Sequence, residues 1–270
     1  MADAHHPVDE TDRDVEAWAL RYIESDRLAD KLTPEPPPSH FSGRVLAVPA
    51  SPGRPPELRI TKHAPKRKGL SNPRARAELL HTFLHHELQA AELMCWAILA
   101  FPDTPRAFKG GLAGVARDEI RHMALYAGHL ASLGHRYGDQ PVRDWFWERV
   151  PSAASPAHFL AAMGMGFEGG NLDHTRRFAE RFRAVGDEEG ARLHERVGAE
   201  EIPHVRFARS WFRDFTGSDD FATWLAHLPA PLSPILMRGA PLDREARRAA
   251  GLSEAFLDEL DAWQDRGPGS

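Results

Sequence analysis

The sequence has little cysteine and no long apolar run. Cys95 is the one cysteine among 270 residues, which excludes a disulfide framework and a thiolate metal cluster. The chain has no apolar stretch approaching the roughly 20 residues that a membrane-spanning helix needs, and its acidic amino terminus does not resemble a signal peptide. We therefore expect a soluble, cytoplasmic protein that does not interact with membranes.

Proline and capping residues mark the starts of four long helices. Each start places a capping residue before proline, or follows a glycine turn. The starts are Asn72-Pro73, Thr104-Pro105, Ser155-Pro156 and Gly186-Asp187. They predict core helices at about 73–101, 105–133, 156–185 and 188–214. With the stretch 134–155 as a crossover between two hairpins, this is the pattern of an all-α, ferritin-like four-helix bundle.

The two predicted hairpins carry the same pair of signals at nearly the same interval. In each, a glutamate on the first helix is followed by a Glu-x-x-His motif on the second. The spacing from the turn places the two at one level in the first hairpin and about one helical turn apart in the second. Residues three apart share a helix face, so each motif can offer a carboxylate and an imidazole to one metal. The candidate ligands are Glu87, Glu119, His122, Glu168, Glu201 and His204.

This donor set suits two divalent cations. Four carboxylates nearly neutralise two such ions, and six ligands leave coordination positions open, which dioxygen activation at iron requires. The sequence therefore predicts two iron ions with dioxygen as co-substrate. Manganese or a mixed iron–manganese pair is the alternative, because both metals suit these ligands.

The position of the motifs in the apolar pattern favours a buried site. Glu119 and His122 lie inside an apolar stripe of one predicted helix, and Glu201 and His204 lie inside a stripe of another. A single Glu-x-x-His is usually a surface feature of an amphipathic helix. Charged groups placed in a core must instead be paired or bound to metal.

The first helix offers two candidate carboxylates. Glu87 lies centrally on the apolar face, and it is therefore the predicted ligand rather than Glu92. His81, His85 and Glu92 share a different stripe. A solvated edge is the simplest interpretation of that stripe, with an outer layer of the metal site or a polar network as alternatives.

Acidic residues precede both Glu-x-x-His motifs. Asp118 precedes Glu119, and Glu200 precedes Glu201. An acid in this position can accept the free ring N–H of the histidine from the opposite hairpin and fix its tautomer. We expect Asp118 to pair with His204 and Glu200 to pair with His122, although acids adjacent to ligands are also common on solvated helix faces.

Helix-breaking residues also lie beside the predicted ligands. Pro203 falls inside the turn from Glu201 to His204, where it should distort the helix. Four glycines surround Glu168, and these are consistent with either a distorted helix or close helix packing. They are Gly164, Gly166, Gly169 and Gly170.

Two extensions flank the predicted bundle at 73–214. Residues 1–72 read as an arm with a helix at 15–31, a proline-rich segment and a basic stretch at 54–76. The basic stretch could bind the phosphates of RNA, although a solvated basic loop is the simpler interpretation. Residues 215–270 read as a tail with a helix near 253–263.

The chain resembles the ferritin-like family catalogued as domain of unknown function 455, which is placed near the tRNA hydroxylases. The matching segments are Pro52-Gly53-Arg54-Pro55, Pro65-Lys66-Arg67, Leu79-Leu80-His81, His85-x-Glu87-Leu88-Gln89-Ala90, Glu168, Leu172-Asp173, Glu201-Ile202-Pro203-His204-Val205, Trp211-Phe212, Arg238-Gly239 and Ala246-Arg247. Separately, the stretch 118–122 resembles a signature of bacterial multicomponent monooxygenases and acyl-carrier desaturases. The resemblances imply a ferritin-like fold and oxygen activation.

Three classes of function fit these patterns. The first is a non-haem di-iron oxidoreductase that uses dioxygen to hydroxylate or oxidise a small-molecule, carrier-bound or RNA-borne substrate, with electrons from an external donor. The second is a ferroxidase or metal-handling protein without an organic substrate. The third is a metal-binding structural protein with no turnover. The long flanking segments favour the first class, because a cage-forming storage subunit would not need them.

Overall fold

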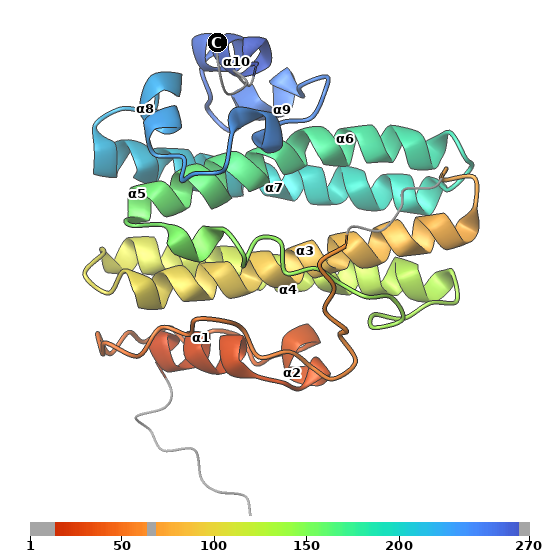
Figure 1. Cartoon of the computed structure of the whole chain (residues 1–270), viewed down its shortest axis with the longest axis horizontal. Helices are drawn as coiled ribbons and strands as arrows, with labels where there is room; N and C mark the ends of the chain where they lie inside the picture. The colour runs from red at the N-terminus through yellow and green to blue at the C-terminus, as the bar shows by residue number, and fades with distance from the viewer. Residues whose placement is uncertain (1–13, 64–68, 265–270) are drawn as a thin grey trace, which may run out of the picture.

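The computed structural model describes residues 14–63 and 69–264, and this part of the chain is helical (Figure 1). Its one pairing of extended backbone is an isolated parallel bridge between Ile60 and Val142. The prediction of an all-α chain is confirmed. The helices are α1 (Val15–Glu24), α2 (Leu28–Leu32), α3 (Pro73–Ala100), α4 (Arg106–Ser132), α5 (Pro156–Phe159), α6 (Gly169–Arg183), α7 (Glu188–Thr216), α8 (Phe221–Ala226), α9 (Arg244–Ala249) and α10 (Glu254–Ala262).

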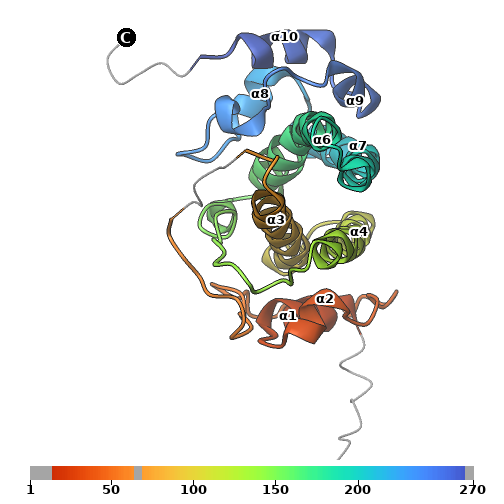
Figure 2. The same ribbon diagram turned by 90° about the vertical axis from the view of Figure 1, so that its right-hand side faces the viewer.

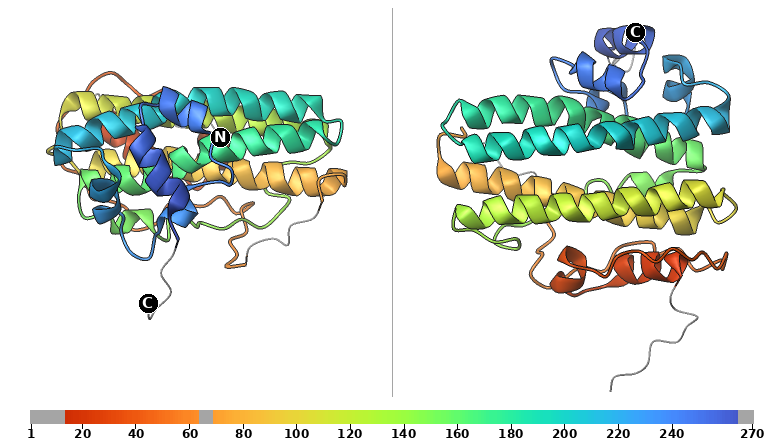
Figure 3. Two further views of the ribbon diagram at one scale, coloured as in Figure 1. Left: turned by 90° about the horizontal axis from the view of Figure 1, so that it is seen from above. Right: turned by 180° about the vertical axis from the view of Figure 1, so that it is seen from behind.

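Two antiparallel helix pairs form the centre of the molecule. Helix α3 packs along α4, helix α6 packs along α7, and α4 contacts α7 across the two pairs. Seen end-on, the pairs are stacked between two outer layers (Figure 2). Helices α1 and α2 cover the first pair, and α8 to α10 lie beyond the second pair (Figure 3). The main core therefore lies between the pairs.

The turns place the candidate ligands at similar levels. Glu87 lies close to the middle of α3, and Glu119 lies at the middle of α4. In the second pair, Glu201 lies close to the middle of α7. Glu168 ends a π-helical segment, η3 (Leu160–Glu168), close to the middle of the continuous helical run that α5, η3 and α6 form together. Because antiparallel helices of similar length align at their centres, the four carboxylates can meet across the core.

The second hairpin contains a π-helical segment beside the predicted ligand Glu168. This segment, η3, links α5 to α6. Helix α7 continues through Pro203, and a distortion at that residue stays a prediction. At Gly164 an added Cβ would lie 2.3 Å from the Cβ of Ala208 on α7. Close helix packing therefore requires this glycine.

The amino-terminal arm contains two short helices, so the prediction of one helix over 15–31 is wrong. The chain breaks after α1, and the Lys31 ammonium reaches back to the last turn of that helix. Lys31 Nζ donates to the carbonyl oxygens of Tyr22 and Ile23, at 2.6 and 2.9 Å. These carbonyls have no partner farther along the helix, so a cation satisfies them.

Glu92 lies in a buried ion-pair network, and the prediction of a solvated edge is wrong. Its carboxylate accepts from Lys31 Nζ at 2.8 Å and from Arg54 Nη1 at 2.6 Å. Arg54 also binds Asp144 of the crossover at 2.8 Å, and Asp144 contacts His85 Nε2 at 3.1 Å. Side chains from the arm, α3 and the crossover thus neutralise one another, and the alternative of a polar network is the correct one.

His81 belongs to the same side of α3 and is buried and neutral. Its Nε2 accepts a hydrogen bond from Gly138 N at 2.9 Å. Burial, assisted by the nearby His85, lowers the pKa of His81 to about 4. The unfolded chain therefore binds a proton near pH 6.5, whereas the folded chain does not until about pH 4, so acidification favours unfolding across that window.

We expect this histidine to make stability depend on pH. Between pH 7 and pH 5 the free energy of unfolding should fall by about 2 kcal/mol on account of His81 alone. Urea titrations of the native chain and of His81→Gln, which keeps an acceptor but does not titrate, would measure the difference. Equal losses of stability in both proteins would contradict the assignment.

The carboxy-terminal segment is anchored to α6 by one buried carboxylate. Asp173 forms a two-point ion pair with Arg247 of α9, with distances of 2.8 and 2.9 Å. It also accepts from the backbone N–H groups of Gly239 and Asp243, both at 2.7 Å. Arg238-Gly239 and Ala246-Arg247, the two tail segments that resemble the family, therefore contact Leu172-Asp173 of α6, which also resembles it. Helix α10 lies within one residue of its predicted bounds.

Among the described residues, no helix combines the length and the apolar character needed to cross a bilayer.

Candidate metal centre

The structure brings the six candidate ligands into the core between the two helix pairs. Glu87 comes from α3, Glu119 and His122 from α4, Glu168 from the end of η3, and Glu201 and His204 from α7. All six side chains are buried, and Glu119, His122 and Glu201 have no exposed surface. Charged groups with so little access to water require partners of opposite charge.

The two central carboxylates are shared between the two histidines. Glu119 lies 3.3 Å from His122 Nδ1 through Oε2 and 3.0 Å from His204 Nδ1 through Oε1. Glu201 lies 3.4 Å from His122 Nδ1 through Oε1 and 2.9 Å from His204 Nδ1 through Oε2. Each carboxylate therefore directs one oxygen toward each imidazole, which is the arrangement of a bridging ligand between two positions.

The outer carboxylates extend this arrangement. Glu87 Oε2 lies 3.9 Å from His122 Nδ1, and ligand atoms of Glu87, Glu119, His122 and Glu201 all lie within 4.8 Å of one another. Glu168 lies on the side of His204, because both line a small apolar cavity of about 10 Å³ between η3 and α7. Each histidine thus has one outer carboxylate beside it.

An unsatisfied oxygen supports the fit of these residues to cations. Glu168 Oε1 is buried and accepts no hydrogen bond from any residue in the described part of the chain. A buried carboxylate oxygen without a donor is costly unless a cation binds it. Carboxylate and imidazole donors match iron and manganese, and six donors can supply two such ions.

The central carboxylates, Glu119 and Glu201, have lowered pKa values, whereas the outer carboxylates, Glu87 and Glu168, have raised ones. Burial acts to raise the pKa of Glu119, but contacts with His122 and His204 outweigh it, and the pKa is lowered. The same contacts raise the pKa of both histidines despite their burial. Burial and the neighbouring carboxylates raise the pKa of Glu168, and burial likewise raises that of Glu87. Metal binding would therefore release protons from this cluster.

Both expected contacts between acids and histidines are present at the outer edge of the cluster. His122 Nε2 lies 3.0 Å from Glu200 Oε2, and His204 Nε2 lies 3.4 Å from Asp118 Oδ2. In each case the acid accepts on the far side of the ring, which directs Nδ1 inward. The hydrogen bond to His204 is the main reason that the pKa of Asp118 is lowered.

We expect Asp118→Asn to weaken metal binding without unfolding the chain. An amide can present its N–H to the ring and so favour the wrong tautomer, and loss of such a partner typically costs about 10–100-fold in metal affinity. Competition with a chelator would measure the change. Asp103→Asn, at an exposed site in the turn between α3 and α4, is the matched control; equal affinities in the two variants would exclude a role for Asp118.

The sequence prediction did not include two further polar residues at the site. Arg121 lies between the outer acids and binds Glu200 at 2.5 Å and Asp118 at 3.3 Å. Asn171 Nδ2 donates to Glu201 Oε1 at 3.3 Å. Asn171 lies one helical turn after Glu168, so helical spacing could have placed it on the same face. The long-range contact of Arg121 is visible in the structure alone.

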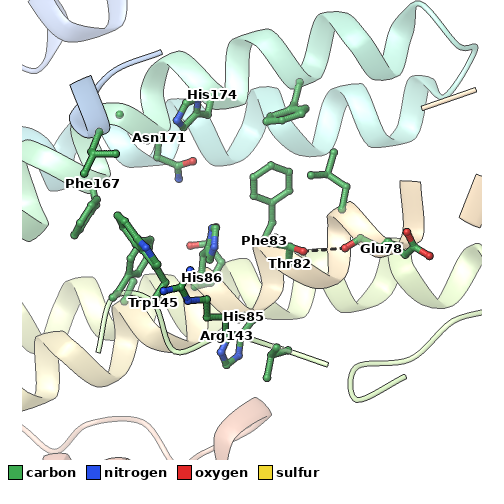
Figure 4. Close-up of a pocket in the computed structure, with 18 of the residues that line it drawn as sticks. Glu78, Thr82, Phe83, His85, His86, Arg143, Trp145, Phe167, Asn171 and His174 are labelled. Atoms are coloured by element: carbon green, nitrogen blue, oxygen red, sulfur yellow. Dashed lines mark hydrogen bonds between the residues drawn. The ribbon is translucent and has the colours of Figure 1, made fainter. Parts of the chain in front are cut away.

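A cavity of about 460 Å³ opens beside the cluster, between α3, α6 and the crossover. Glu87 and Glu168 are among its lining residues. Figure 4 shows Asn171 of α6 facing Phe83 and His86 of α3 across the space. The cavity is large enough for a small organic molecule. It reaches both outer carboxylates, Glu87 beside His122 and Glu168 beside His204.

The basic stretch at 54–76 is partly internal. Arg54 is held in the buried network with Glu92, and Arg76 Nε lies 3.1 Å from Asp187 at the start of α7. The interpretation of the whole stretch as a solvated loop is therefore wrong for these two arginines. Lys66, Arg67 and Lys68 lie outside the described residues, and binding of RNA by this stretch stays a prediction.

Comparisons with known proteins find similarity over most of the chain. The chain is 26% identical over 213 residues to an uncharacterized protein of Haemophilus influenzae, and the aligned part covers 75% of this chain and 73% of that protein. No solved structure matches the chain. Residues 3–258 match the family described as "Protein of unknown function (DUF455)". Since the match covers nearly the whole sequence, the chain belongs to the DUF455 family.

Proposed function

We propose that the chain is a non-haem di-iron oxidoreductase with a ferritin-like bundle, which activates dioxygen to hydroxylate or oxidise an organic substrate. The observation that carries the proposal is the sharing of Glu119 and Glu201 between the two histidines. This arrangement defines two adjacent positions, each with one imidazole and access to both central carboxylates. An ordinary buried ion pair would not need two positions.

The fold supports this assignment. Two antiparallel pairs joined by a crossover place one glutamate on each of two helices and a Glu-x-x-His motif on each of the other two. That distribution is the one found in ferritin-like carboxylate proteins that hold two irons or two manganese ions.

The residues of the chain have distinct tasks in this proposal. His122 and His204 would hold one ion each, and Glu119 and Glu201 would bridge them, while Glu87 and Glu168 complete the set beside the cavity. Glu200 and Asp118 keep each Nδ1 directed inward by accepting from Nε2. A bound pair of iron(II) ions would supply two electrons for the reduction of dioxygen.

The electrons for a further cycle must come from outside the described part of the chain. Cys95, the one cysteine, is buried on α3, and burial raises the pKa of its thiol. It therefore offers neither a sulfur-ligated metal centre nor an accessible thiol for electron transfer. An external electron donor is accordingly part of the proposal.

A ferroxidase that handles metal without an organic substrate is the second candidate. The same six ligands would serve it. The 460 Å³ cavity favours the oxidoreductase, because it places a space large enough for an organic molecule against Glu87 and Glu168. A path for hydrated metal ions would not require the phenylalanine and tryptophan side chains that form part of its walls.

An iron titration separates the two candidates. Protein given excess iron(II) in air is expected to retain about two irons per chain after gel filtration, and its iron(II) form should consume dioxygen. Retention of many tens of irons would instead support storage. Absence of dioxygen consumption above the level of Glu119→Gln would overturn both catalytic candidates and leave a structural metal site.

A further inference from the structure

The cavity has aromatic walls beside the metal centre and arginines at its other end. Near the metal centre its walls include Phe83, Phe146 and Phe167. The rings of Phe146 and Phe167 stack with centroids 4.7 Å apart, and Trp145 packs edge-on to Phe167 at 5.2 Å. Flat, apolar walls of this kind favour a flat, apolar ligand because they bury its faces.

The other end carries arginines. Asn171, His174, Phe178 and Arg181 follow one face of α6 and all line the cavity. From Asn171 to Arg181 the helix advances by about 15 Å. Arg181 is exposed and Arg177 is half-buried, whereas Glu168 is 4% exposed. The arginines therefore lie at the open end, and the carboxylates lie at the closed end.

Both arginines pack against the same aromatic ring. The guanidinium carbon of Arg177 lies 5.1 Å from the centre of the Phe178 ring, and that of Arg181 lies 5.4 Å from it. Residues four apart are neighbours on a helix surface, and both arginines line the cavity. Guanidinium groups bind phosphate or carboxylate through two parallel hydrogen bonds.

The opposite wall carries an acidic residue that has its own partner. Glu78 of α3 lines the cavity and is bound to Arg74 at 3.1 Å. Arg143 of the crossover also lines the cavity, but it is bound to Glu148 at 2.9 Å. Arg177 Nη2 lies 3.2 Å from His174 Nδ1. Arg177 and Arg181 are therefore the cationic groups that would attract an anion to this end.

We propose that the substrate of this site is a small molecule with a flat apolar body and an anionic group, phosphate or carboxylate, at one end. The body lies along the wall formed by Phe83 and the stacked pair Phe146 and Phe167, and the anion binds Arg177 and Arg181. This rests on the proposed function, because it takes the end beside Glu87 and Glu168 as the reacting end. The helical rise places Arg177 and Arg181 about 14 and 20 Å along the axis from Glu168 at the reacting end.

Calorimetric binding of matched probes tests this assignment. The probes are 2-naphthyl phosphate, 2-naphthoate, the neutral 2-naphthol, and inorganic phosphate. At least one naphthyl anion should bind the native chain more tightly than both 2-naphthol and inorganic phosphate. The two naphthyl anions show which anionic group is preferred. The affinity of the better anion should fall by about tenfold or more in the double variant Arg177→Gln/Arg181→Gln, and that of 2-naphthol should not change.

Further variants keep the result interpretable. Arg181→Gln alone, at an exposed position, should show part of the loss with no effect on folding, and Arg181→Lys should restore part of the affinity through its charge. Phe146→Ala should weaken both the naphthyl anions and 2-naphthol. Equal anion affinities in native and double-variant chains, or inorganic phosphate binding as tightly as the naphthyl anions, would overturn the proposal.

The metal content of the same samples separates this inference from the function on which it rests. A chain that holds two metal ions but binds none of the naphthyl probes keeps the proposed function and loses this substrate class. A chain that binds the naphthyl anions through the arginines but holds no metal keeps the ligand class and loses the di-iron function.

Discussion

Protein purified from iron-replete cells is expected to contain about two iron or manganese ions per chain, and Glu119→Gln is expected to lose both. Glu119 approaches both histidines, with separations of 3.3 and 3.0 Å, so its removal takes one ligand from each position. An amide in its place would also bring no charge to balance the cations. Elemental analysis against protein concentration measures the ratio.

A matched variant on the neighbouring helix tests whether the loss is specific. Glu195→Gln changes an exposed carboxylate on α7 that pairs with Arg183 at the surface, so its metal content should equal that of the native chain. Glu168→Ala should lose metal mainly from the position beside His204. A native ratio near one that Glu168→Ala does not change would show that the second hairpin does not contribute its outer carboxylate.

Glu92→Gln is expected to destabilise the fold by about 3–5 kcal/mol, because it leaves buried cations without their counter-charge. Lys31 and Glu92 are both fully buried, and Arg54 is nearly so. Burial and the two cations act in opposite directions on the carboxyl, and the cations hold the pKa of Glu92 below its usual value. Urea unfolding at neutral pH would measure the loss.

A double variant and a surface control test the cause. Lys31→Met combined with Glu92→Gln should lose less stability than the sum of the two single variants, since removing one buried cation relieves the imbalance. Glu148→Gln, at an exposed ion pair with Arg143 and Arg149, should change stability by no more than about 1 kcal/mol. A loss in Glu92→Gln no larger than in this control would show that the network does not hold the arm on α3.

The sequence predicted the long helices and the candidate ligands because both depend on short-range regularities. A capping residue before proline marks a helix start locally, as at Asn72, whose side chain accepts from Arg74 N. A Glu-x-x-His motif places two donors on one helix face regardless of the rest of the fold. The expected contacts of Asp118 and Glu200 follow from the same regularity once the two hairpins face each other.

The errors arose where distant segments determine the environment of a residue. Periodicity along α3 separates Glu92 from Glu87, but the partners of Glu92 lie 61 residues away in Lys31 and 38 residues away in Arg54. Similarly, the sequence left open whether the glycines around Glu168 reflect a distorted helix or close packing, and only the approach of α7 to Gly164 in η3 shows that both apply. The sequence around Glu92 does not indicate its ion-pair partners, and the sequence around Gly164 does not indicate that α7 lies against it.

The sequence by itself determined that the chain is helical, where its long helices begin, and which six side chains are candidate ligands, because each of these follows from patterns within a few residues. The tertiary structure decided which charged groups are neutralised by ion pairs, and that Glu119 and Glu201 are each shared between the two histidines. It also decided that a cavity lined by arginines reaches the outer carboxylates, Glu87 and Glu168. These depend on how four helices, an arm and a crossover approach one another, which is set by packing between residues far apart in the chain.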